Sequence, residues 1–162
     1  MNTKCFCSFY ASEAHLITML LPYMKQKMEE RYEIKIFSEQ DLTEVSKKII
    51  DNILCKEENG NLRRLKWKDD KVKLDENNKK VIIIVGSNEY MNRIKQSLND
   101  GRNCEDIIID CFEYDKDESE ILKILDEHSK IVNTKGEVLK EDLFTQFTQK
   151  ARKCNKEITI MK

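Results

Sequence analysis

The chain has 162 residues, a length typical of one domain. Its 29 basic and 30 acidic residues give a formal net charge of -1, which disfavours a general binder of nucleic acid or of anionic membranes. No apolar run approaches the roughly 20 residues that span a bilayer, and the N-terminus lacks the long apolar stretch of a signal peptide. We therefore expect a single cytoplasmic domain over residues 1–162, without a membrane segment and with its six cysteines as free thiols.

Strand-like and helix-like segments alternate along the chain. Residues 12–31 place apolar side chains at i, i+3, i+4 and i+7, which predicts a helix. Residues 79–86 are continuously apolar, which predicts a strand buried on both faces, whereas the alternation in 32–38 predicts an edge strand. In chain order we expect strand 4–10, helix 12–31, strand 32–38, helix 41–54, strand 79–86, helix 88–101, strand 105–114, helix 117–130, strand 130–133, helix 140–154 and strand 157–161.

This alternation predicts an α/β fold, a three-layer sandwich with a mostly parallel, Rossmann-like sheet. Residues 61–75 interrupt the pattern, because Leu65 and Trp67 alternate there with basic residues. We interpret this segment as an inserted polar hairpin, with a surface loop as the alternative.

The loops that follow the expected strands are the predicted ligand site, since open α/β sheets bind ligands beyond the carboxyl ends of their strands. This inference rests on the fold alone. The loops carry polar or small residues suited to hydrogen bonding. The candidate ligand-binding residues are Tyr10, Ser12, Ser38, Gly86, Ser87, Asn88, Asn133, Thr134 and Lys135.

The turn Gly86-Ser87-Asn88 joins the apolar strand to a helix, the arrangement in which many proteins hold a phosphate. It has one glycine rather than three and no Lys-Ser/Thr pair, so it is neither a dinucleotide fingerprint nor a P-loop. The alternative is structural: Gly86 makes the turn and Ser87 or Asn88 caps the helix. Lys135 offers a positive charge on another of these loops.

Cys5 and Cys7 share one face of the first expected strand, and His15 lies one turn into the next helix. A site for a metal or for redox sensing is one interpretation of these residues, and core packing of buried cysteines is the other. Core packing is favoured because no second closely spaced pair of ligands accompanies them. We therefore expect no metal and no cofactor, with Cys5, Cys7 and His15 as the alternative ligands.

No constellation of catalytic residues emerges from the sequence. No Gly-x-Ser-x-Gly elbow precedes a helix, and the chain has only two histidines, His15 and His128. Asp110 interrupts an apolar strand, so its buried carboxylate needs a partner. A structural hydrogen bond is favoured for Asp110 over a role as a general base, and the domain is expected to be non-catalytic.

The first third of the chain resembles the opening of the MEDS family, the sensory domain of methanogen and methylotroph regulators. The similarity lies in "CSFYASEAH" (7–15) and "LLPYMKQKME" (20–29). It implies an α/β domain that binds a small molecule and passes the signal to a regulator, with Cys7, Phe9 and Tyr10 in the motif. The histidine that the family often carries two residues before the cysteine is replaced here by Cys5.

Taken together, these patterns predict a small sensory or regulatory domain that binds a polar or anionic small molecule at the strand carboxyl ends. Two alternatives stay open. One is a protein-interaction module acting through residues 61–75 and Trp67. The other is an enzyme on a nucleotide, using the Gly86-Ser87-Asn88 turn and Asp110. A protein partner or a homodimer is compatible with the sequence, and nucleic acid is disfavoured.

Overall fold

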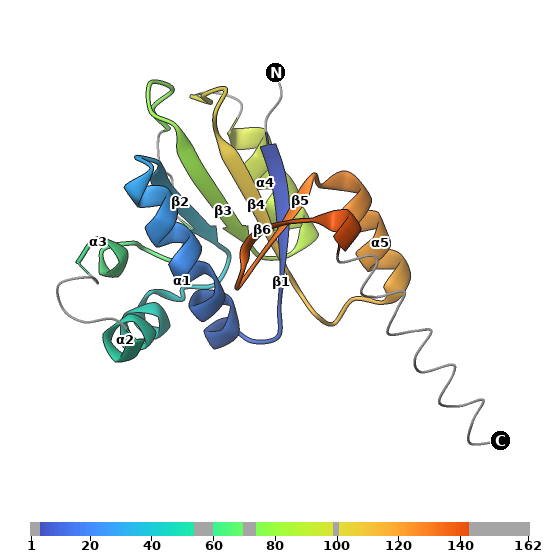
Figure 1. Ribbon diagram of the computed structural model, residues 1–162, viewed down its shortest axis with the longest axis horizontal. Helices are drawn as coiled ribbons and strands as arrows, with labels where there is room; N and C mark the ends of the chain where they lie inside the picture. Colours follow the sequence, from blue (N-terminus) through green and yellow to red (C-terminus); the bar gives the residue numbers. More distant parts are fainter. Residues whose placement is uncertain (1–3, 54–59, 70–73, 99–100, 143–162) are drawn as a thin grey trace.

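The computed structural model describes residues 4–53, 60–69, 74–98 and 101–142 (Figure 1). Strands and helices alternate through most of this part of the chain, as predicted. The elements are β1 (Lys4–Tyr10), α1 (Glu13–Glu29), β2 (Glu33–Ser38), α2 (Thr43–Ile53), α3 (Gly60–Arg63), β3 (Lys80–Val85), α4 (Asn88–Ser97), β4 (Ile107–Glu113), α5 (Glu118–Glu127), β5 (Lys130–Asn133) and β6 (Gly136–Leu139).

The strands form one six-stranded sheet in the order β2-β3-β4-β1-β5-β6. All neighbouring strands from β2 to β5 run parallel, and β6 pairs with β5 in the antiparallel direction. The prediction of an α/β fold with a mostly parallel sheet is therefore confirmed. β2 lies at one edge, as its alternating pattern indicated, whereas β6 at the other edge was not predicted.

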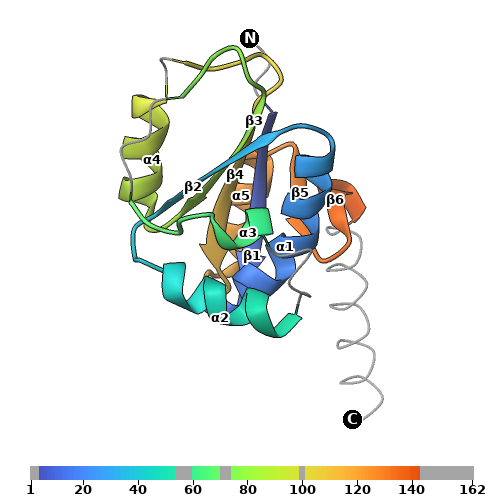
Figure 2. The same ribbon diagram turned by 90° about the vertical axis from the view of Figure 1, so that its left-hand side faces the viewer.

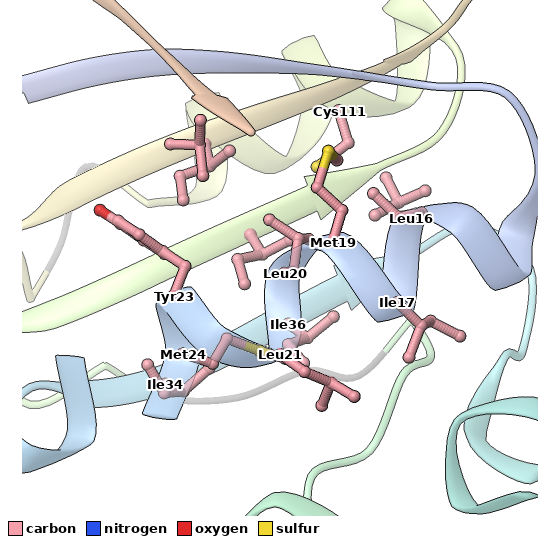
Figure 3. Close-up of a cluster of buried hydrophobic side chains, with 14 of the residues drawn as sticks. Leu16, Ile17, Met19, Leu20, Leu21, Tyr23, Met24, Ile34, Ile36 and Cys111 are labelled. Carbon is pink, nitrogen blue, oxygen red and sulfur yellow. The ribbon is translucent and has the colours of Figure 1, made fainter. Parts of the chain in front are cut away.

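Helices cover both faces of the sheet (Figures 1 and 2). The face under α1, α2 and α3 buries Val81, Ile83 and Val85 of β3, and the face under α4 and α5 buries Ile82 and Ile84. Figure 3 shows side chains of α1 directed at the strands. β3 is apolar without a break because it meets a helical layer on both sides.

Side-chain caps fix where three of the helices begin. The hydroxyl of Ser12 accepts from the backbone N–H of His15 (3.1 Å), and the hydroxyl of Ser87 accepts from that of Tyr90 (3.2 Å). The carboxylate of Asp117 accepts from the N–H of Glu120 (2.8 Å). Each cap satisfies one backbone donor and stabilises its helix by about 1 kcal/mol.

Residues 61–75 differ from the predicted hairpin in the part that the structure describes. Gly60–Arg63 form helix α3, and Lys68 makes an isolated parallel bridge to Phe37 of β2. Trp67 is completely buried, in the same core cluster as the buried side chains of α1. Its indole contributes to folding, so it is not available as the interaction surface considered above. Residues 70–73, where the hairpin was expected to turn, lie outside the described residues.

The C-terminal predictions fall largely outside the described part of the chain. Residues 140–142 are helical, but the rest of the predicted helix 140–154 and all of strand 157–161 lie beyond the described residues. None of the described helices combines the length and the apolarity needed to cross a membrane.

An ion pair is buried at the amino-terminal side of the sheet, where β3 begins. The ammonium of Lys80 lies 3.2 Å from Oδ2 of Asp106, and both side chains are completely buried. The same ammonium donates to the carbonyl oxygens of Asp75 (2.8 Å) and Asn78 (2.9 Å). Lys80 thereby ties the loop before β3 to the loop before β4.

Candidate functional site

A cleft of about 270 Å³ lies at the carboxyl ends of β1, β2, β3 and β4. The loops that follow these parallel strands lead to helices on different faces of the sheet. α/β proteins commonly bind ligands at such a position. Four residues singled out from the sequence line it, namely Tyr10, Ser38, Gly86 and Ser87. The full lining is Tyr10, Glu13, Ser38, Glu39, Gln40, Leu42, Val85, Gly86, Ser87, Phe112, Glu113, Asp115 and Lys116.

The other candidate residues do not line this cleft. Ser12 serves as the cap of α1, and Asn88 is the first residue of α4. Asn133, Thr134 and Lys135 lie at the turn between β5 and β6, where the side chain of Asn133 accepts from the backbone N–H of Lys135 (2.8 Å). The structure therefore brings together candidates that follow β1, β2 and β3. The three candidates of the turn between β5 and β6 lie outside this cleft.

The cleft is acidic. Four carboxylates line it, from Glu13, Glu39, Glu113 and Asp115, against the single ammonium of Lys116. Two aromatic side chains, Tyr10 and Phe112, complete the lining. Carboxylates and aromatic rings together attract cations and repel anions. The charge of the site thus opposes the anionic ligand that the small polar loops suggested.

The start of α4 is occupied by a carboxylate of the protein itself. Oε1 of Glu39 accepts from the backbone N–H of Ser87 at 3.0 Å, so this amide is not free for a phosphate. Gly86 permits the close approach, because a Cβ there would lie 2.6 Å from a ring carbon of Tyr90 and 3.0 Å from Glu39. These contacts give the turn a structural role, and Gly86 and Ser87 also line the cleft.

Tyr10 places a phenol hydroxyl in the cleft, beside a carboxylate. Its hydroxyl donates to Oε1 of Glu113 at 3.5 Å, and its ring is almost fully buried. Burial, reinforced by the charge of Glu113, raises the pKa of Tyr10 well above its ordinary value. The phenol consequently stays protonated and acts as a hydrogen-bond donor at neutral pH.

A second hollow has the opposite charge. This groove of about 640 Å³ runs along α2 and α3 and is lined by five basic and two acidic side chains. None of the residues predicted to bind a ligand belongs to it. Its lining residues are Asp41, Thr43, Glu44, Lys47, Gly60, Arg63, Arg64, Leu65, Lys66 and Lys68.

Four reactive side chains meet on the face of the sheet covered by α4 and α5. Asp110 of β4 is buried, and its Oδ2 lies 2.8 Å from Nε2 of His128 and 3.8 Å from the sulfur of Cys5. The ammonium of Lys95 on α4 also bonds Oδ2 of Asp110 and lies 3.9 Å from the sulfur of Cys5. We call these four residues the Asp110 cluster.

Hydrogen bonding dominates the electrostatics of the Asp110 cluster. Burial acts to lower the pKa of His128, but its hydrogen bonds to Asp110, Cys5 and the carbonyl of Ile124 outweigh that effect and raise the pKa to about 9. The neighbouring thiol of Cys7 responds differently. Burial, with the charge of Asp110, raises the pKa of Cys7 to about 12, so Cys7 remains a protonated core residue.

The sequence singled out Asp110 as a buried carboxylate that needs a partner. It did not identify Cys5, Lys95 or His128 as the partners of Asp110. Asp110 stood out because it interrupts an apolar strand, and the structure gives it the buried partners that this position requires. His128 ends α5, and Lys95 lies in the last turn of α4, so both helices deliver a cation to Asp110. In the described residues, Cys5 joins Asp110 and His128 in a potential metal-ligand group rather than Cys7 and His15.

Comparison of this chain with protein-family models, with curated proteins and with solved structures finds no match.

Proposed function

We propose that this protein is a non-catalytic sensory or regulatory domain that binds a small organic cation in the acidic cleft at the strand carboxyl ends. The observation that carries the proposal is the lining of this cleft, where four carboxylates and two aromatic rings face a volume of about 270 Å³. That volume lies just below the range of about 300–1,000 Å³ common for ligand pockets, so it suits a small ligand. The resemblance to the MEDS family supports a sensory role, with Tyr10 as the residue common to its motif and the cleft.

The arrangement of the carboxylates favours an organic cation over a metal ion. Among the described residues, the potential metal-ligand group is Cys5, Asp110 and His128, and none of these lines the cleft. Carboxylates that are spread around a cleft suit an amine or guanidinium group with several hydrogen-bond donors. Tyr10 and Phe112 also line the cleft, and aromatic rings can add a cation–π attraction for such groups.

Isothermal titration of the purified chain with small amines and guanidines tests this proposal, alongside anions such as phosphate and citrate. Glu113→Gln combined with Asp115→Asn removes two negative charges from the lining, so we expect cation affinity to fall by about tenfold or more. The matched control, Asp126→Asn with Glu127→Gln, makes the same charge change on the exposed side of α5. The proposal fails if no cation binds, if anions bind instead, or if both double variants weaken binding equally.

A further inference from the structure

The imidazole of His128 is oriented by a backbone carbonyl. Its Nδ1 lies 2.5 Å from the carbonyl oxygen of Ile124, which only accepts hydrogen bonds, so Nδ1 carries a proton. Nε2 is then the ring nitrogen directed into the Asp110 cluster, at 2.8 Å from Oδ2 of Asp110. Histidines that bind metals through one ring nitrogen commonly donate the other N–H to a carbonyl in this way.

Asp110 has more acceptor capacity than its neighbours use. Its Oδ2 receives the contacts from Lys95, His128 and Cys5, while its Oδ1 is buried without a hydrogen-bond partner in the described part of the chain. An unsatisfied buried carboxylate oxygen is costly to a protein and calls for an explanation. A metal ion bound through both oxygens of this carboxylate would give Oδ1 a partner.

The three potential ligand atoms have the spacing of a metal site. The sulfur of Cys5, a carboxylate oxygen of Asp110 and a ring nitrogen of His128 all lie within 4.8 Å of one another. Ligand atoms around a tetrahedral Zn²⁺ are about 3.4 Å apart, given zinc–ligand bonds of about 2.0–2.3 Å. The separations of 3.8 Å (Cys5 sulfur to Asp110 Oδ2) and 2.8 Å (Asp110 Oδ2 to His128 Nε2) lie on either side of this value.

We propose that Cys5, Asp110 and His128 form a zinc site, and that the ammonium of Lys95 holds the cation position when the metal is absent. Thiolate, imidazole and carboxylate are the ligand types that zinc accepts together. Three protein ligands leave a fourth position for water or another donor.

Lys95 explains how the cluster is stable without metal and how metal reaches it. Its ammonium contacts the carboxylate of Asp110 and the sulfur of Cys5, two of the three proposed ligands. Its side chain is 31% exposed, so it connects the buried carboxylate to solvent. Cys5 is also partly exposed. Swinging Lys95 outward would open the site from this side.

The test uses Zn²⁺ alone, added to the full chain after removal of metals with a chelator, and measures affinity by competition with a chromogenic zinc chelator. Cys55, Cys104 and Cys154 are first replaced by serine, which leaves Cys5 and the buried Cys7 and Cys111 as the thiols. This background is expected to bind one equivalent of zinc. Adding Cys5→Ser or His128→Gln should weaken binding by at least about 100-fold, since loss of an outer-shell partner alone costs 10–100-fold. Unchanged affinity in either variant overturns the site.

The Lys95→Met variant separates this proposal from a purely structural ion-pair network. Removing the ammonium should tighten zinc binding by about tenfold or more, because zinc no longer has to displace Lys95 from the carboxylate of Asp110. Weaker or unchanged binding contradicts the role assigned to Lys95. Cobalt(II) provides a second readout in the Lys95-containing background: a thiolate-to-cobalt charge-transfer band supports ligation by Cys5, and its absence overturns it even if a Cys5 variant fails to fold.

Discussion

The buried ion pair of Lys80 and Asp106 gives the sharpest stability prediction. The Lys80→Met variant keeps the length of the side chain but removes the ammonium, which leaves the carboxylate of Asp106 buried without a charged partner. Removing one partner of a buried pair costs about 3–5 kcal/mol. Asp106 retains hydrogen bonds from the backbone N–H groups of Lys80 (2.8 Å) and Asn103 (2.9 Å), so we expect the lower end, about 3 kcal/mol.

Urea unfolding followed by the fluorescence of Trp67 measures this loss, because Trp67 is the single tryptophan and is completely buried. A loss of about 3 kcal/mol corresponds to a fall in Tm of roughly 6–12 °C for a domain of this size. The Lys48→Met variant is the matched control, since Lys48 is exposed on α2, and it should change the free energy of unfolding by less than about 0.5 kcal/mol. Equal stability of the two variants would refute the reasoning.

Three further predictions concern packing, thiol reactivity and pH. The Gly86→Ala variant should lose about 1–3 kcal/mol of stability in urea unfolding, because its Cβ would press on the ring of Tyr90; a stability equal to that of the wild type would contradict this packing. In the native protein, iodoacetamide followed by peptide mass spectrometry should label the exposed Cys104 and spare Cys7, whose pKa is raised to about 12; labelling of both at similar rates would show that Cys7 is not buried. The folded-state pKa of His128, about 9, lies above its ordinary value of 6.5. With a metal chelator present, the contribution of protonated His128 to the free energy of unfolding is therefore complete below pH 6.5 and is lost as pH rises through 9. This loss amounts to about 3 kcal/mol at most and should be absent from the pH dependence of the His128→Gln variant.

The sequence predicted the elements best where local physics decides them. The apolar run of β3 identified a strand with helices on both sides. The expected helices 12–31, 88–101 and 117–130 begin at or next to Ser12, Ser87 and Asp117, whose side chains cap them through contacts only three residues away. Local pattern misled at Trp67. Its alternation with basic residues is also typical of a hairpin strand, but the indole packs into the core with residues that are distant in the sequence.

The sites depend on strand order, which no local pattern contains. Cys5, Asp110 and His128 meet because β1 lies between β4 and β5 in the sheet, although the three residues are far apart in the chain. The acidic character of the cleft was missed for a similar reason. The candidate residues were chosen as small polar loop residues, so Glu39 and Glu113 were not among them. The parallel alignment of the strands brings these two carboxylates to one cleft.

Amide chemical-shift mapping tests the central claim most directly. An isotope-labelled sample is titrated with the amine or guanidine that binds most tightly in calorimetry. The account predicts that the largest shift changes fall on the backbone amides of Tyr10, Ser38, Ser87 and Glu113, at the carboxyl ends of four neighbouring strands. Changes confined to the basic groove along α2 and α3 or to the turn between β5 and β6, or no changes at all, would contradict it.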